Sequence, residues 1–169
     1  AAIDAYKEVL ALDPEDGASA LRLGMALSNT GAQEEAIEAY KNAAALGQEA
    51  NANKQISSIY LKDAAAQLKA KAYAAAAEAA KNCNQYAENA QAYLVLGQAS
   101  QQLKKNADAI SAFEKYLELS PNAKNAGAIA LTVGALYQGD KNNAKALEFY
   151  KKAQELGTDA KQYIDALSK

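Results

Sequence analysis

A chain of 169 residues, half of them apolar, is long enough to bury a core of its own. Its formal net charge is −2, and no run of like charges could hold phosphates or an anionic bilayer, which argues against nucleic acid and membrane surfaces as partners. The chain has no histidine and one cysteine, Cys83, which excludes His-based nucleophile pairs and the usual Cys/His zinc sites.

The distribution of polar residues also argues against a membrane span. A span needs roughly 20 uninterrupted apolar residues, and a charged residue or Gln interrupts every apolar stretch before that length. We therefore expect a soluble protein. The chain begins at Ala1 without Met, already inside a helical pattern, so an upstream targeting segment would not be visible. The compartment stays open between the cytoplasm and the bacterial periplasm.

Good helix formers dominate the chain, and its prolines are confined to Pro14 and Pro121. The composition therefore predicts an all-α protein. In chain order the predicted helices cover about 1–11, 16–29, 33–46, 50–68, 71–85, 89–103, 106–119, 124–138, 142–156 and 159–168. The turns between them are short, which forces neighbouring helices to run antiparallel.

Two short motifs recur along the chain. A small residue stands four positions before an aromatic one at Ala2/Tyr6, Ala36/Tyr40, Ala109/Phe113 and Ala146/Tyr150. An apolar residue followed by glycine occurs at Leu23-Gly24, Leu96-Gly97 and Val133-Gly134, always with 12 residues from the glycine to the next alanine of the first motif. Glycine inside a helix costs about 1 kcal/mol relative to alanine, so its recurrence indicates a neighbouring helix that crosses very closely.

This pattern resembles the tetratricopeptide repeat, whose motif reads W-x2-L-G-x2-Y, then A-x3-F, then P on a 34-residue period. The third unit matches it with Tyr93, Leu96-Gly97, Ala109, Phe113 and Pro121. The resemblance, to the bacterial type of these proteins, implies a right-handed α-solenoid of antiparallel helix–turn–helix repeats with about ten helices. It divides 1–169, as a single array, into a half repeat 1–14, repeats at about 17–50, 51–89, 90–123 and 127–160, and a final helix 161–169.

The second unit departs from the motif. Ser57-Ser58 stands where the other units have Leu-Gly, and Ala76-x3-Ala80 replaces the aromatic element. From Ser58 to Ala76 there are 18 residues instead of 12, which predicts six extra residues that lengthen the hairpin around 63–68. A further three extra residues are expected around 124–126, before the fourth unit.

Repeats of this family curve around a concave groove that their first helices line, and the groove binds a peptide or a partner helix. The resemblance implies that the groove is lined by Leu21, Met25, Asn29, Gln55, Ile59, Lys62, Gln91, Leu94, Gln98, Gln101, Gln102, Leu131, Ala135 and Gln138. Most of these are amides or aliphatic residues, so the basic clamp with which some family members hold chaperone carboxylate tails is missing.

Two readings of these residues remain open at this point. Gln98, Gln101 and Gln102 fit either hydrogen bonding to an extended ligand or a solvated helix face. Met25 and Leu94 fit either contact with a partner or the core of the repeats.

The resemblance, together with the absence of catalytic residue types, implies an interaction scaffold or adaptor and not an enzyme, with no metal site and no cofactor. Its expected partner is a protein or peptide of unknown identity. The alternative is an assembly module, in which the end helices, which lack their repeat partners, and the lengthened second hairpin mediate self-association or docking onto other domains of a longer chain.

Overall fold

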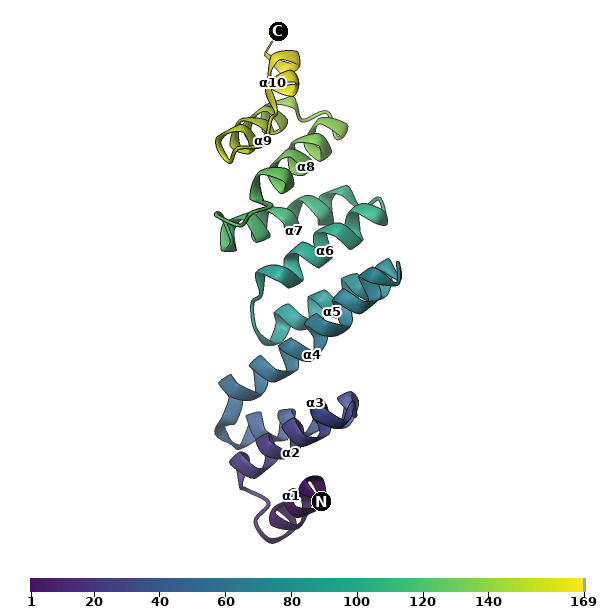
Figure 1. Cartoon of the computed structure of the whole chain (residues 1–169), viewed down its shortest axis with the longest axis vertical. Coiled ribbons are helices and arrows are strands. Elements are labelled where there is room, and N and C mark those ends of the chain that lie inside the picture. Colours follow the sequence, from purple (N-terminus) through teal and green to yellow (C-terminus); the bar gives the residue numbers. More distant parts are fainter. Residues whose placement is uncertain (169) are drawn as a thin grey trace. The chain divides into compact units, whose positions relative to one another are not determined.

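The computed structural model describes residues 1–168, and these residues form helices and turns without strands (Figure 1). The helices are α1 Ala2–Leu12, α2 Gly17–Thr30, α3 Gln33–Ala43, α4 Glu49–Lys69, α5 Tyr73–Tyr86, α6 Ala90–Gln102, α7 Asn106–Leu119, α8 Ala126–Gly139, α9 Asn143–Glu155 and α10 Lys161–Leu167. Consecutive helices pack in pairs, most closely α2 with α3, α6 with α7 and α8 with α9. The predicted all-α fold of helical hairpins is confirmed. The last position of the predicted final helix, 169, lies outside the described residues.

The chain forms two compact units, which are described separately below. The first unit comprises Ala1–Asp63 and Asn82–Glu88, and the second comprises Ala64–Lys81 together with the chain from Asn89 onward. The base of the α4–α5 hairpin therefore belongs to the first unit and its tip to the second. None of the helices within residues 1–168 has the length and apolar content needed to cross a bilayer.

The predicted close crossing at the repeated glycines is present in both units. A Cβ atom on Gly24 would lie 2.6 Å from the ring of Tyr40, and one on Gly97 would lie 2.5 Å from the ring of Phe113. A Cβ atom on Gly134 would likewise lie 2.6 Å from the ring of Tyr150. Because all three rings are at most 1% exposed, they cannot move away into solvent. Each glycine thus lets the first helix of a hairpin rest directly on the aromatic ring of the second.

We predict that Gly24→Ala and Gly97→Ala each lower the free energy of unfolding by about 1–3 kcal/mol, because the added methyl group overpacks a site that has no room for it. Gly139→Ala is the matched control, since nothing lies within 4 Å of a Cβ at that position. Urea unfolding followed by circular dichroism measures all three variants. Equal stability of the Gly97 and Gly139 variants would contradict this account of the glycines.

The tips of the four hairpins share one turn geometry. The residue in the left-handed conformation is Gly31 (φ 85°) in the α2–α3 hairpin, and Lys71, Lys104 and Lys141 (φ 60°, 58° and 61°) in the later ones. In each tip the N–H of this residue donates to the carbonyl three positions earlier, and the next N–H donates five positions back, as from Ala32 to Leu27 and from Ala72 to Gln67. This pair of hydrogen bonds is the Schellman motif, which ends the first helix of each hairpin at the same point.

The common turn corrects the predicted register of the second hairpin. We call the position of Gly24, Gly97 and Gly134 the glycine slot, and the alanine four positions before the aromatic residue (Ala36, Ala109 and Ala146) the motif alanine. In these three hairpins the left-handed residue comes seven positions after the glycine slot and five before the motif alanine. The same spacing around Lys71 leads to Ala64 and Ala76, so Ala64 occupies the glycine slot and not Ser58. The prediction of six extra residues around 63–68 was therefore wrong. It relied on matching a dipeptide, whereas the length of a hairpin is set by its turn.

The extra residues lie instead at the start of α4. Ser57 stands seven positions before Ala64, as Gly17 stands seven before Gly24, but α4 begins already at Glu49. Eight additional helical residues lengthen α4 by about 12 Å. Ala52 and Ile56 in this extension are fully buried in the core of the first unit, alongside Ala20, Tyr40 and Ala43. The extension therefore supplies core contacts to the α2–α3 hairpin.

The second hairpin has neither the glycine nor the aromatic ring of the other three. Its glycine slot holds Ala64, and Ala80 stands where the other hairpins have the aromatic ring. Both alanines are fully buried. A methyl group on the first helix is tolerated when the opposing residue on the second helix is a methyl group as well. The two small residues stand where the other hairpins have glycine and a ring, so we expect them to face each other across the hairpin.

This substitution predicts a coupled pair. Ala80→Tyr should destabilise the chain by about 1–3 kcal/mol through a clash with the Ala64 methyl group, and Ala64→Gly alone should cost about 1 kcal/mol. The double variant should be more stable than the sum of the two losses by about 1 kcal/mol or more. The free energies of unfolding of the wild type, the two single variants and the double variant form a double-mutant cycle that measures this coupling. Strict additivity would show that positions 64 and 80 do not face each other.

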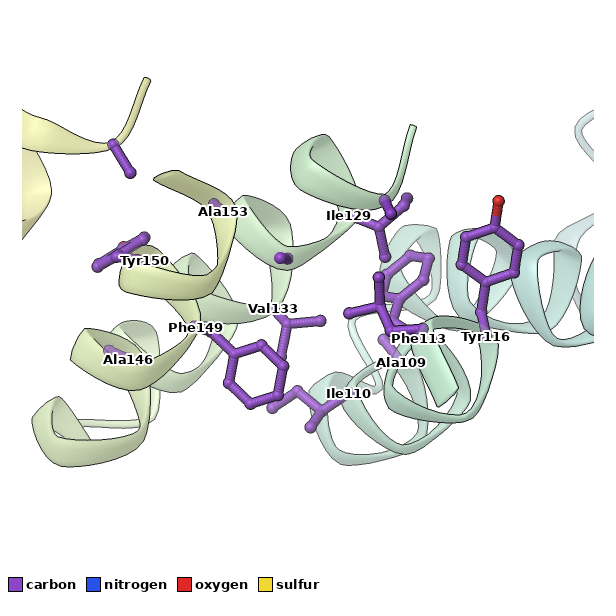
Figure 2. Close-up of a cluster of buried hydrophobic side chains, with 14 residues drawn as sticks. Ala109, Ile110, Phe113, Tyr116, Ile129, Val133, Ala146, Phe149, Tyr150 and Ala153 are labelled. Carbon is purple, nitrogen blue, oxygen red and sulfur yellow. The ribbon is translucent and has the colours of Figure 1, made fainter. Parts of the chain in front are cut away.

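The second unit is held together by an apolar cluster with hydrogen-bonded tyrosines at its margin. Figure 2 shows Phe149, Val133 and Ile110 facing one another between α9, α8 and α7, and all three are buried. At the margin the Tyr137 hydroxyl donates to Glu114 Oε1 at 2.7 Å, which ties α8 to α7. The Tyr116 hydroxyl donates to Asn125 Oδ1 at 2.5 Å and anchors the start of α8.

The Tyr137 contact predicts a pH-dependent contribution to stability. Burial of the Tyr137 hydroxyl, together with its hydrogen bond to Glu114, raises its pKa to about 12. A folded-state pKa above the unfolded value stabilises the protein below about pH 10, and this contribution disappears as the pH rises towards about 12. The stability difference between wild type and Tyr137→Phe should therefore be largest at neutral pH and shrink above pH 10. Urea unfolding at several alkaline pH values measures it, and a constant difference would contradict the assignment.

Candidate functional site

The corrected register changes which residues of the second repeat correspond to the groove positions. Gln55, Ile59 and Lys62 were assigned by placing the glycine slot at Ser58. With Ala64 in that slot, their counterparts are Leu61, Ala65 and Leu68. Leucine then stands three positions before the slot in every repeat, at Leu21, Leu61, Leu94 and Leu131, and each of these is half-buried. Ile59 is only 8% exposed and belongs to the core of the first unit, so it offers no surface to a partner.

The remaining predicted groove residues differ in exposure. Met25 is 46% exposed, which is unusual for a large apolar side chain. The other exposed members are Asn29, Lys62, Gln91, Gln102, Ala135 and Gln138. The half-buried members are Leu21, Gln55, Leu94, Gln98, Gln101 and Leu131.

One of the predicted residues has an internal partner. The Tyr150 hydroxyl donates to Gln138 Oε1 at 2.7 Å, so the carbonyl oxygen of this amide is engaged within the α8–α9 hairpin. Gln138 therefore helps to fix the ring that packs against Gly134. Its side chain is less available to a partner than those of the glutamines on α6.

The structure brings three predicted residues together in the second unit. Gln98, Gln101 and Gln102 from α6 line a hollow of about 340 Å³ with Leu68 from the end of α4 and Tyr73 from the start of α5. We call this the glutamine hollow. Leu68 and Tyr73 were not among the predicted groove residues, because the predicted register placed extra residues in their hairpin. The turn around Lys71 carries the signal that would have found them, since Leu68 has the same place in its hairpin as Gln101.

The glutamine hollow offers hydrogen bonds without charge. Within residues 1–168 no hydrogen bond engages the side-chain amides of Gln98, Gln101 or Gln102. Each amide provides a carbonyl acceptor and an N–H donor, the same pair of groups that a peptide main chain offers in reverse. Leu68 and Tyr73 add apolar surface beside them. The combination suits an extended polypeptide better than a small charged ligand.

The first unit contains a larger hollow, of about 710 Å³, that the sequence did not predict. Apolar residues from α2 and α3 line it together with Tyr60, which stacks on Tyr86 at a ring distance of 5.9 Å. Its rim carries both signs of charge, and Lys41 Nζ lies 3.0 Å from Glu38 Oε1. Because its floor includes the core residue Leu27 and its rim charges offset one another, this hollow is the weaker candidate despite its size.

Catalytic and metal chemistry find little support in the described chain. Residues 1–168 contain no group of three or more Cys, Asp or Glu side chains placed to hold a metal ion. Cys83 is buried, with Sγ 3.1 Å from Ser57 Oγ. Burial raises the pKa of the Cys83 thiol, which keeps it protonated and a poor nucleophile.

Comparison with known proteins agrees with this architecture. The sequence profile of the tetratricopeptide repeat matches residues 18–46 and 90–123. Among solved structures, MamA from Desulfovibrio magneticus RS-1 is 22% identical over 92% of this chain and 83% of its own, with a TM-score of 0.51. Another MamA structure is 28% identical over 92% and 86%, with a TM-score of 0.49.

PilF from Pseudomonas aeruginosa is 22% identical over 91% of this chain and 67% of its own, with a TM-score of 0.47. No curated protein sequence matches the chain. MamA and PilF are both tetratricopeptide-repeat proteins, and the likeness to the Desulfovibrio MamA is one of fold. The two profile matches show tetratricopeptide repeats at residues 18–46 and 90–123, and proteins built from such repeats are in general protein-interaction scaffolds.

Proposed function

We propose that the chain is a scaffold that binds an extended segment of a partner protein, and that the glutamine hollow holds part of this segment. The observation that carries the proposal is the convergence of Gln98, Gln101 and Gln102 with Leu68 and Tyr73 around one hollow of the second unit. Residues from two hairpins meet there, so the hollow exists only because the repeats are stacked.

The chemistry of the hollow supports a peptide as the ligand. Amide side chains that make no internal hydrogen bond can pair with the N–H and C=O groups of a main chain without a change of charge. Each such hydrogen bond contributes a net stabilisation of about 0.5–1.5 kcal/mol. The apolar surface of Leu68 and Tyr73 can cover one aliphatic or aromatic side chain of the segment. Affinity would come from the main chain and selectivity from that side chain.

The first helix of each hairpin extends the proposed surface within its own unit. On α2 the face carries Leu21, Met25 and Asn29, and the exposure of Met25 provides an adaptable apolar contact. On α6 the face carries Leu94 together with Gln98 and Gln102. These residues were expected from family resemblance, and their binding role is part of the proposal.

A peptide selection tests the proposal without knowledge of the natural partner. Random 12-residue peptides displayed on phage are selected on the whole chain, and synthetic copies of the binders are titrated by fluorescence polarisation. The double variant Gln98→Ala with Gln102→Ala should weaken binding by about fivefold to a hundredfold, since two hydrogen bonds are lost. The matched control is Gln85→Ala with Gln162→Ala, which removes two exposed glutamines outside the hollow.

Two results would count against the proposal. If the selection yields no binder, the chain lacks a general peptide site of this kind. If binders are found but the Gln98/Gln102 variant binds them as tightly as the control variant does, the binding surface lies elsewhere on the chain.

A further inference from the structure

The hairpin tips of the second unit carry lysines in an unfavourable backbone conformation. Lys71, Lys104 and Lys141 all have a left-handed backbone with φ near 60°, where Gly31 stands in the first hairpin. This conformation costs a side-chain-bearing residue about 1–2 kcal/mol, whereas glycine adopts it freely. The turn geometry thus does not explain the lysines, because glycine would suit it better. Their recurrence at three successive tips indicates that the charged side chain itself has a role.

The charge of these tips differs from that of the rest of the chain. The eight residues around each tip, 68–75, 101–108 and 138–145, contain six lysines and only two acidic residues, Asp108 and Asp140. The equivalent residues of the first hairpin, 28–35, contain no lysine and two glutamates. The whole chain has a net charge of −2, so the basic tips stand out against an acidic background.

The three tips are neighbours in space. The glutamine hollow joins the first two, because Leu68 and Tyr73 from the α4–α5 tip line it together with Gln101 and Gln102 from the α6–α7 tip. Asn106 Nδ2 donates to Asp140 Oδ1 at 3.1 Å, which joins the α6–α7 tip to the α8–α9 tip. In Figure 1 the three turns lie on one side of the second unit. The three basic tips therefore lie along one edge of the second unit.

We name five of these residues the tip lysines: Lys69, Lys71, Lys104, Lys105 and Lys141. All five are exposed, and none forms an ion pair with any residue of 1–168. Lys69 directly follows Leu68 of the hollow, and Lys104 comes two positions after Gln102. The uncharged hollow is thus flanked by unpaired positive charge on both of the hairpins that form it.

We propose that the tip lysines make this edge selective for an acidic polypeptide segment, whose main chain lies in the glutamine hollow and whose Asp or Glu side chains pair with the lysines. The proposal rests on the proposed function, because it specifies the segment that the hollow binds. Opposite charge at the rim of a peptide site speeds association and excludes like-charged partners, while the uncharged centre supplies the hydrogen bonds.

The surroundings of the tip lysines favour a polypeptide over other anions. A concave hollow with three free amides and an apolar wall suits a main chain, whereas a bilayer or a duplex would meet only the outer lysines. Nucleic-acid binding also relies on many phosphate contacts and an overall basic surface, and this chain carries a net charge of −2.

The test compares two variants that each remove four positive charges. The tip variant is Lys69→Gln, Lys71→Gln, Lys104→Gln and Lys105→Gln. The control variant is Lys81→Gln, Lys124→Gln, Lys151→Gln and Lys161→Gln, all exposed lysines of the second unit away from the tips. Glutamine keeps most of the side-chain length and a good helix propensity, and circular dichroism verifies that both variants are folded.

The phage library described above is selected on wild type and on the tip variant. We expect wild-type binders to be enriched in Asp and Glu by about twofold or more over the unselected library, and the enrichment to vanish on the tip variant. Synthetic wild-type binders should bind the tip variant about tenfold more weakly, with less than a twofold change for the control variant, and the difference should shrink at about 0.5 M salt, where charges are screened.

Each other outcome overturns the inference. Binders without acidic enrichment, or equal affinity of the tip and control variants, would remove the role of the lysines while leaving the glutamine test of the proposed function intact. A selection without any binder would overturn both. Two further probes are vesicles of phosphatidylcholine with phosphatidylserine and a 20-base-pair duplex DNA. If either binds the chain through the tip lysines more tightly than the acidic peptides do, the edge is a site for that anion instead.

Discussion

The close approach of two helices within each hairpin is the constraint on which the rest of this structure depends. In three hairpins a glycine on the first helix rests on an aromatic ring of the second, with no space for even a methyl group between them. The rings are buried, so they also form the contacts between that hairpin and its surroundings. The Schellman turn at each tip holds glycine and ring at a constant spacing. Packing and turn geometry thus enforce the same register.

The second hairpin shows how the constraint can be met with different residues. Ala64 and Ala80 occupy the positions of the glycine and the ring, and together they bury far less apolar surface than glycine and a ring would. The extended start of α4 offsets part of this loss, because Ala52 and Ile56 add buried surface in the first unit. The hairpin is also divided between the two compact units, its base in one and its tip in the other.

The candidate site follows from the way the hairpins stack in the second unit. Antiparallel pairs place the end of every first helix at one edge, so Gln101 and Gln102 reach Leu68 and Tyr73 of the preceding hairpin. The same geometry brings the left-handed lysines of successive tips to that edge. On α6, Gly97 packs the hairpin while Gln98, Gln101 and Gln102 line the hollow, so the core contact and the candidate site lie on one helix.

The sequence by itself determined the helices, the position of the glycines and the repeat type, since these depend on local propensity and on motifs with a constant spacing. It placed α4 at 50–68, close to the observed Glu49–Lys69, and it identified Gly24, Gly97 and Gly134 as close contacts. It failed at the second repeat, because Ala64 stands in a run of alanines and has no local mark that distinguishes a buried contact from a surface residue. Only the tertiary structure decided that register, through the turn at Lys71. It alone also joined Leu68 and Tyr73 to glutamines about 30 positions away, because contacts between stacked hairpins depend on packing and leave no periodic signal in the chain.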